Sequence, residues 1–362
     1  MKKALIFLAV TSFINIVIRV ICRISLPFSE WYAMRVYPLI VGFWGRVTGI
    51  FPFAVVEILF YILISTAIVS IVFLIIKLIK GKRRRVRYLL RAGLAFSCAV
   101  STLLVMFLFG CEINYQRNPF SYYSGLELTM YSRDDLRGAI TEVIGELDLL
   151  VPQITTGADG GFVLDKTTFN KTARESMQRL GGIYPVLYTY YPNPKPVFSS
   201  RFIMSPLMIC GIFSPFTIES LYNTDMPDSD KPFTALHELS HLNGFMREDE
   251  ANFIAFLACR ESMDLDFMYS GYIHALSYLL RAYDGDDYIQ IYRTIPEQVR
   301  LQYALDTEYW QSFLNAPGGA AIAAVSSAVN DAYLKTQGQE DGVKSYGRVV
   351  DLLIADYLAR NK

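Results

Sequence analysis

The sequence predicts a membrane-anchored α+β protein, with three N-terminal transmembrane helices followed by a mostly helical domain that contains a small sheet. Of its 362 residues, 52% are hydrophobic, and its mean hydropathy is +0.28. This is more apolar than a soluble domain usually is. The apolar residues concentrate in the first third of the chain. Further along, helical periodicity dominates, apart from one region with the pattern of short strands.

Three segments are long enough to cross a bilayer, which takes about 20 apolar residues. They cover residues 4–21, 53–79 and 89–110. Lys2 and Lys3 before the first segment are also typical of a signal peptide. However, Asn15 and Arg19 interrupt its apolar run, and no cleavage-site pattern follows. We therefore expect an uncleaved span and a membrane domain over residues 1–111.

Basic residues predict the orientation of these spans. The link between the second and third spans is rich in lysine and arginine, namely Lys77, Lys80, Lys82, Arg83, Arg84, Arg85 and Arg87. By the positive-inside rule this link is cytoplasmic. We therefore expect a multi-pass protein of the cell membrane, with a cytoplasmic N-terminus and an extracytoplasmic region after Cys111. The expected partner of the spans is the lipid bilayer. A formal net charge of zero argues against nucleic acid as a partner.

The region outside the membrane begins with a predicted linker at residues 112–131, which are polar and aromatic. Residues 132–362 are long enough for one sizeable domain. A helix is predicted from Ser132 to Leu150, because Ser132 can cap its start and acidic residues occupy its first turn. A second helix is predicted over residues 166–180, after a glycine-rich break.

The helical period then disappears between Tyr184 and Asn223, where prolines recur. Apolar, β-branched and aromatic residues predict short strands at 202–204, 207–210 and 216–219. From Glu248 onwards the sequence again predicts mostly helix.

The five cysteines do not form a disulfide framework. Three of them, Cys22, Cys98 and Cys111, lie in or beside the predicted spans. Only Cys210 and Cys259 belong to the outer domain. Either one disulfide or two buried thiols is compatible with this pattern.

One stretch of five residues, His237-Glu238-Leu239-Ser240-His241, carries the most specific chemical pattern, HExxH. Residues four apart on a helix share one face, so the two imidazoles can bind one metal ion. Zinc prefers such nitrogen ligands, and a catalytic site keeps one position open for water. Glu238 lies at the edge of the same face, where a general base is needed.

The helix that carries this pattern has recognisable ends. Asp230 is a candidate N-cap, and Pro232 stands near the first helical position. Asn243 and Gly244 predict its end, because glycine is the usual residue just past a helix. The helix is therefore expected to span about 12 residues, with both histidines near its middle.

A catalytic zinc site needs a third protein ligand. Glu248 is our first candidate, because a turn at Gly244 lets a second helix return towards the histidines. Glu250 is the second candidate and Asp249 the third. All three are also the acidic residues that a helix N-terminus favours. The remaining histidine, His274, has apolar neighbours that indicate a core or interface position.

The segment from Pro232 to Ser262 resembles the gluzincin metallopeptidases, in which HExxH is followed by a glutamate helix. The continuation with Arg247 does not fit the metzincin pattern, in which this position is a third histidine. The resemblance implies His237, His241 and Glu248 as zinc ligands and Glu238 as the base. It also implies that Asn252 orients a ligand, and that an edge strand for substrate binding precedes the metal helix, within residues 211–221.

Over its whole length, the chain is similar to a bacterial multi-pass membrane family of unknown function. The likeness covers the spans, the metal helix, residues 215–217, residues 248–256 and residues 342–347. In such a family, peptidase activity is implied only by the motif. The expected function is therefore a zinc-dependent metallopeptidase that cleaves a peptide or protein substrate outside the cytoplasm. The alternative is a non-catalytic metal-binding or sensor protein with the same zincin-like fold.

A zinc peptidase also needs a donor for the oxyanion that forms on the substrate. Tyr346 and Arg348 are candidates, because they lie in the Ser345–Arg348 run. With 24 tyrosines in the chain, Tyr346 can equally be structural.

Overall fold

The computed structural model describes residues 1–81, 84–337, 339 and 348–361. Its chain divides into two compact units. Unit 1 comprises Met1–Arg117 and Ser214–Glu219, and unit 2 comprises Asn118–Phe213 and Ser220–Lys362. Mostly helical structure with one small sheet agrees with the predicted fold class.

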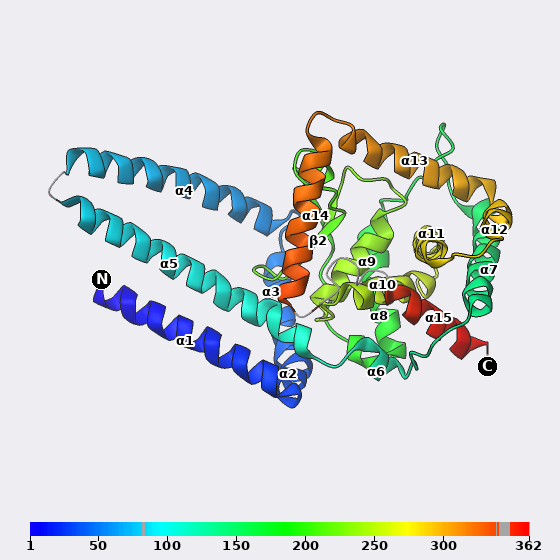
Figure 1. The fold of residues 1–362 in the computed structure, drawn as a ribbon, viewed down its shortest axis with the longest axis horizontal. Helices are drawn as coiled ribbons and strands as arrows, with labels where there is room; N and C mark the ends of the chain where they lie inside the picture. The colour runs from blue at the N-terminus through cyan, green and yellow to red at the C-terminus, as the bar shows by residue number, and fades with distance from the viewer. Residues whose placement is uncertain (82–83, 338, 340–347, 362) are drawn as a thin grey trace. The chain divides into compact units, whose positions relative to one another are not determined.

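Unit 1 contains three helices that are long and apolar enough to cross a membrane (Figure 1). They are α1 (Lys2–Ile24), α4 (Val55–Lys80) and α5 (Arg85–Gly110). The three predicted spans are thereby confirmed, and the protein is a multi-pass membrane protein. Helix α1 packs along α5, with the hydroxyl oxygens of Thr11 and Ser101 2.7 Å apart. This hydrogen bond satisfies two polar groups in otherwise apolar helices.

Three short helical segments lie between the first two spans, where we predicted none. They are α2 (Leu26–Trp31), the π-helical η1 (Tyr32–Val36) and α3 (Tyr37–Gly49). The buried Tyr32 and Tyr37 donate hydrogen bonds to the carbonyl oxygens of Phe109 and Gly110, at 2.5 and 3.2 Å. These are carbonyls at the end of α5 that no further helical turn can satisfy.

The segment Ser214–Glu219 packs within unit 1. The Glu219 carboxylate accepts hydrogen bonds from the backbone N–H groups of Val55 and Val56, at 3.0 and 2.9 Å. These groups begin α4, so the carboxylate both satisfies free donors and complements the positive end of the helix dipole.

The predicted linker at residues 112–131 contains two short helices, η3 (Glu112–Gln116) and α6 (Phe120–Ser124). The predicted helix after it is confirmed as α7 (Arg133–Leu150). Ser132 and Asp135 form a reciprocal capping box at its start. The second predicted helix corresponds to α8 (Phe169–Ile183).

The sheet has three strands in the order β1-β3-β2. They are β1 (Lys195–Val197), β2 (Gly211–Ser214) and β3 (Glu219–Asn223). Strand β1 pairs in parallel with β3, with Lys195 opposite Leu221. The predicted strand positions were wrong except at Glu219, which begins β3. Residues 202–204 and 216–218 form turns, Leu207 ends a 3₁₀ helix, and 208–210 lie between that helix and β2. Prolines, serines and positive backbone φ at Met208 and Ile218 break the apolar runs.

Helices α9 (Lys231–Leu242), α10 (Glu248–Arg260) and α11 (Leu265–Ala282) pack against one another at the centre of unit 2. Figure 1 shows them with α8 and α15 (Val349–Arg360) beside α10. Leu236, Leu239, Phe253, Leu257 and Leu276 are fully buried between them. Burial of such side chains contributes about 1.5–3 kcal/mol each and fixes the helices that carry the histidines.

The remaining helices are α12 (Tyr288–Thr294), α13 (Glu297–Leu314) and α14 (Gly319–Thr336). Helices α13 and α14 pass the length and hydropathy criteria for a span only as a pair, which is bent by 99°. Within unit 2, Tyr303 of α13 donates a hydrogen bond to the carbonyl of Ile273 at 2.6 Å, and Ser326 of α14 donates one to that of Leu207 at 2.8 Å.

Candidate metal centre

Helix α9 places its two histidines on one face. Asp230 is the N-cap residue and Pro232 lies in the first turn, as predicted. The His237 and His241 rings are perpendicular, with centroids 4.6 Å apart. The predicted stop is also confirmed, because Gly244 adopts a φ of 101°, which favours glycine.

The turn at Gly244 brings the start of α10 back to the histidines. The backbone N–H of Gly244 bonds to His241 O, and that of Phe245 bonds to Ser240 O. Glu248 is the first residue of α10. Its Oε2 atom lies 3.2 Å from His237 Nε2 and 3.7 Å from His241 Nε2. The chain reversal therefore brings together the three residues that the sequence predicted as ligands.

These three residues fit a zinc ion. One ligand atom from each lies within 4.8 Å of the others. Around a tetrahedral zinc with bonds of about 2.0–2.2 Å, ligand atoms are separated by roughly 3.4 Å. Two imidazole nitrogens and one carboxylate oxygen are the donors of a catalytic zinc site, in which a fourth position stays open.

The His241 ring has the tautomer that metal binding requires. Its Nδ1 atom lies 2.8 Å from the carbonyl oxygen of Phe245. Because a carbonyl oxygen only accepts, Nδ1 must carry the proton in this bond. The Nε2 lone pair is then available on the side of Glu248. A hydrogen bond of this kind orients metal-bound histidines.

Without a metal, the same atoms interact as charged groups. Burial alone would lower the pKa of His241, but the charge of Glu248 raises it to about 9. Burial would raise the pKa of Glu248, but His241 and His237 hold it well below its usual value. The site is therefore an acceptor-rich cluster that needs positive charge, which a proton or a divalent cation can supply.

Glu238 is buried beside this cluster and has a free oxygen. The residue is 4% exposed, and its Oε2 atom has no hydrogen-bond partner within the described residues. Burial raises the pKa of Glu238 to about 7, although the charges of His237 and His241 oppose the shift. An unsatisfied buried carboxylate oxygen costs about 1–3 kcal/mol, so it indicates a role that requires a free proton acceptor.

Strand β2 passes close to Glu238. A Cβ atom added at Gly211 would lie 2.5 Å from Glu238 Oε1 and 2.7 Å from Thr234 Cγ2. Only glycine lets the backbone approach this closely. Because β2 lies at the edge of the sheet, an edge strand does precede the metal helix, as the resemblance implied.

The other candidate ligands are engaged elsewhere. Glu250 Oε1 accepts from the Phe120 N–H at 3.1 Å and from Arg247 at 3.2 Å. Asp249 forms an ion pair with Arg348 at 3.7 Å. Glu250 and Asp249 therefore have partners within the protein and do not need a metal ion to balance their charge.

Two further expectations have different outcomes. Tyr346 lies outside the described residues. Asn252 is buried, but its Nδ2 atom has no partner within the described residues. The Nδ1–H group of His241 instead donates a hydrogen bond to the carbonyl oxygen of Phe245. The sequence could not identify the Phe245 carbonyl as the partner of His241, because every residue has a backbone carbonyl oxygen.

Cys210 and Cys259 are free thiols in the structure; Cys259 is buried and Cys210 is partly exposed. Burial raises the pKa of both well above its usual value. They are therefore protonated at neutral pH and are poor zinc ligands.

The fold and the cluster together define a multi-pass membrane protein with a candidate metal centre in its second unit. A family model described as "Protein of unknown function (DUF3810)" matches residues 32–354, so the chain belongs to this family. No curated protein and no solved structure matches the chain.

Proposed function

We propose that the protein is a membrane-bound zinc metallopeptidase with a gluzincin-type, zincin-like domain. The observation that carries this proposal is the convergence of His237, His241 and Glu248 beside Glu238, whose Oε2 atom has no partner among the described residues. The donor set suits zinc, and the free carboxylate suits a proton acceptor. A zinc ion held there would lower the pKa of a water molecule and polarise a substrate carbonyl.

In the proposed reaction, Glu238 moves one proton. Its free oxygen takes the proton from the water whose oxygen attacks the peptide carbonyl carbon. It then gives that proton to the amide nitrogen as the C–N bond breaks. One water is consumed, and the products are a carboxylic acid and an amine, which ionise to a carboxylate and an ammonium group.

Strand β2 supports a peptide as the substrate. An extended chain can add to the edge of a sheet through backbone hydrogen bonds, largely independently of its side chains. Gly211 begins this edge next to Glu238. A peptide along β2 would therefore present its carbonyl groups near the proposed base.

We also propose that unit 2 lies outside the cytoplasm. This rests on the basic residues between α4 and α5, which the positive-inside rule assigns to the cytoplasm. The chain then crosses the membrane once more in α5, so the region after α5 lies on the opposite side.

Metal analysis and cleavage of a peptide mixture by the purified full-length protein test the peptidase proposal. We expect about one zinc per chain, and a loss of cleavage of roughly 10²–10⁴-fold on Glu238→Gln with zinc retained. Glu175→Gln is the control, because Glu175 is exposed on α8, where it forms an ion pair with Lys171. Unchanged cleavage by Glu238→Gln would refute the mechanism. Bound zinc without cleavage by the parent would favour the metal-binding or sensor alternative.

A further inference from the structure

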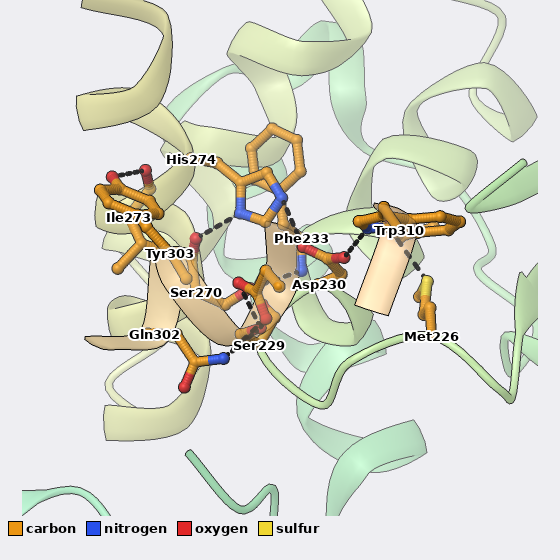
Figure 2. Close-up of polar contacts among 12 residues, drawn as sticks. Met226, Ser229, Asp230, Phe233, Ser270, Ile273, His274, Gln302, Tyr303 and Trp310 are labelled. Atoms are coloured by element: carbon orange, nitrogen blue, oxygen red, sulfur yellow. Dashed lines mark hydrogen bonds and ion pairs between the residues drawn. The ribbon is translucent and has the colours of Figure 1, made fainter. Parts of the chain in front are cut away.

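Helix α13 is anchored in the packed core of unit 2. The hydroxyl of Tyr303 donates a hydrogen bond to the carbonyl of Ile273 on α11 at 2.6 Å. The indole N–H of Trp310 donates one to Asp230, at the start of α9, at 3.3 Å. Figure 2 shows both contacts, which join α13 to two central helices. Of the large apolar side chains in the bent pair, only Leu301 is exposed on α13, whereas three are exposed on α14.

Helix α14 packs on unit 2 along one narrow face. Ser326 donates a hydrogen bond to the carbonyl of Leu207 at 2.8 Å, and Leu334 is fully buried. Residues eight apart lie on one side of a helix, so Ser326 and Leu334 define the face that contacts the rest of unit 2. Figure 1 shows α14 in orange after the bend that follows α13. Only Gly319 and Leu334 of its 18 residues are buried, so most of its surface lies outside the core.

The remaining surface of α14 is apolar. Its exposed residues, which we call the apolar face, are Ala320, Ala321, Ile322, Ala324, Val325, Ser327, Ala328, Val329 and Ala332. Ser327 is the only polar residue among them, and Val325 and Val329 are each 64% exposed. The first charged residue of the helix, Asp331, pairs with Lys335 at 2.6 Å near the C-terminal end. A helix exposed to water normally has charged or polar residues on its outer side, so this composition indicates apolar surroundings.

Two observations indicate that these surroundings are lipid. Together with α13, α14 meets the hydropathy criterion for a membrane span, although the bend of 99° prevents a straight crossing. The same chain also has the three spans α1, α4 and α5. Only residues 111–117 lie between the end of α5 and unit 2, and this connection reaches at most roughly 30 Å. The tether gives the bilayer a high effective concentration at unit 2, so even a small apolar face can stay in contact with it.

A second copy of the chain fits the apolar face less well. A stable protein–protein interface takes about 20–30 residues from each partner, which is far more than this face contains. Such interfaces are also enriched in aromatic residues and arginine, and the apolar face has neither. Contact with acyl chains requires only apolar side chains, which the face supplies.

We propose that the apolar face of α14 contacts the lipid bilayer, with the helix lying in the plane of the membrane surface. Val325 and Val329 then lie about 5–10 Å into the boundary between the headgroups and the acyl chains. The contact holds unit 2 in one orientation on the membrane. It requires neither zinc nor cleavage, so it is independent of the proposed peptidase function.

The test measures the depth of position 325 in the full-length protein. An environment-sensitive fluorescent amino acid is incorporated in place of Val325, and the protein is placed in nanodiscs of phosphatidylcholine and phosphatidylglycerol. Iodide quenches the probe from water, and a phospholipid with a nitroxide on its acyl chain quenches it from the bilayer. Leu149 on α7 is the matched control position, because it is also a large apolar residue, 66% exposed against 64% for Val325.

We expect the acyl-chain nitroxide to quench the probe at Val325 but not at Leu149. Iodide should quench it at least about fivefold less at Val325 than at Leu149, because a side chain within the acyl boundary is out of reach of ions in water. A charge on the apolar face should reverse this pattern. With the probe at Val329, Val325→Asp should raise iodide quenching, since a carboxylate is costly in hydrocarbon, whereas Leu149→Asp should not.

Three results would overturn the inference. Equal iodide quenching at Val325 and Leu149 would show that the apolar face lies in water. Protection of Val325 from both quenchers would show that protein covers the face, either a second copy or another part of the same chain. Unchanged iodide quenching at Val329 in Val325→Asp would show that the position of this face does not depend on lipid. Because none of these readouts involves zinc or cleavage, the membrane contact and the peptidase function can fail separately.

Discussion

His237 Nε2 and Glu248 Oε2 lie 3.2 Å apart, although the two residues belong to different helices. The turn around Gly244, which joins α9 to α10, creates this proximity. It places a carboxylate where it can share a cation with both histidines. Several consequences of this arrangement and of its surroundings can be measured.

Replacing Glu248 by glutamine should weaken zinc binding. An amide oxygen carries no charge, so the site loses its only predicted anionic ligand. Removal of outer-shell partners costs 10–100-fold in metal affinity, and we expect this direct ligand to cost more than about 100-fold. Competition with a zinc chelator measures the change. Glu261→Gln, just past the other end of α10, is the control; equal affinities for the two variants would contradict the assignment of Glu248.

Gly211→Ala should disturb both the edge strand and the proposed base. The added methyl group would lie 2.5 Å from Glu238 Oε1, so β2 or Glu238 must move. We expect a destabilisation of about 1–3 kcal/mol and a fall in cleavage. Gly145→Ala is the control, because it lies in α7 with no atom within 4 Å of the added Cβ. It should be neutral or stabilise by up to about 1 kcal/mol. Thermal unfolding and peptide cleavage are the measurements, and a harmless Gly211→Ala would show that β2 can shift freely.

Asp306 should make stability depend on pH. Burial and the neighbouring charge of Asp230 raise the pKa of Asp306 to about 7, from its usual value of 3.8. Between these two values the folded state binds more protons than the unfolded state. The contribution of Asp306 to stability therefore falls as the pH rises from about 4 to about 7.

Asp306→Asn should remove this pH dependence while keeping an acceptor for Ser229 and Gln302, which contact Asp306 at 3.0 and 2.7 Å. Unfolding in denaturant at a series of pH values measures the difference between parent and variant. We expect the variant to gain on the parent from pH 4 to pH 7. A constant difference over that range would show that Asp306 titrates normally.

His274→Phe should destabilise the packing of α11 on α9. Phenylalanine keeps the stack on Phe233 but leaves the partly buried Asp230 without its histidine partner. We expect a loss of about 1–3 kcal/mol. Adding Asp230→Asn should recover part of it, because no carboxylate charge then remains. A double-mutant cycle from denaturant unfolding gives the coupling energy, and strictly additive losses would mean that the ion pair contributes nothing.

The orientation of the spans can be tested with fusions. Alkaline phosphatase joined after Lys362 should be active, because this enzyme matures only outside the cytoplasm. The same reporter joined between α4 and α5 should be inactive. The reverse pattern would place unit 2 in the cytoplasm and refute the orientation inferred from the basic residues.

The spans and the metal helix could be predicted because local sequence determines them. Apolar length alone identifies α1, α4 and α5. The boundaries of α9 follow from Pro232 and Gly244, which act on the backbone within a few residues. The strands could not be located in this way. Apolar runs of three or four residues occur in turns as well as in strands. Pairing between segments that are distant in the sequence decides which residues become strands, as the pairing of Lys195 with Leu221 shows.

The sequence by itself determined that the chain crosses a membrane and that two histidines share one helical face. It ranked Glu248 first among the candidates for the third ligand, ahead of Glu250 and Asp249. The tertiary structure alone shows that Glu248 lies beside the histidines, while Arg247 and the Phe120 backbone bind Glu250. It also brought Gly211 to Glu238 and His274 to the metal helix. Such contacts join elements that are distant in the chain, and only the packing of the folded core determines them.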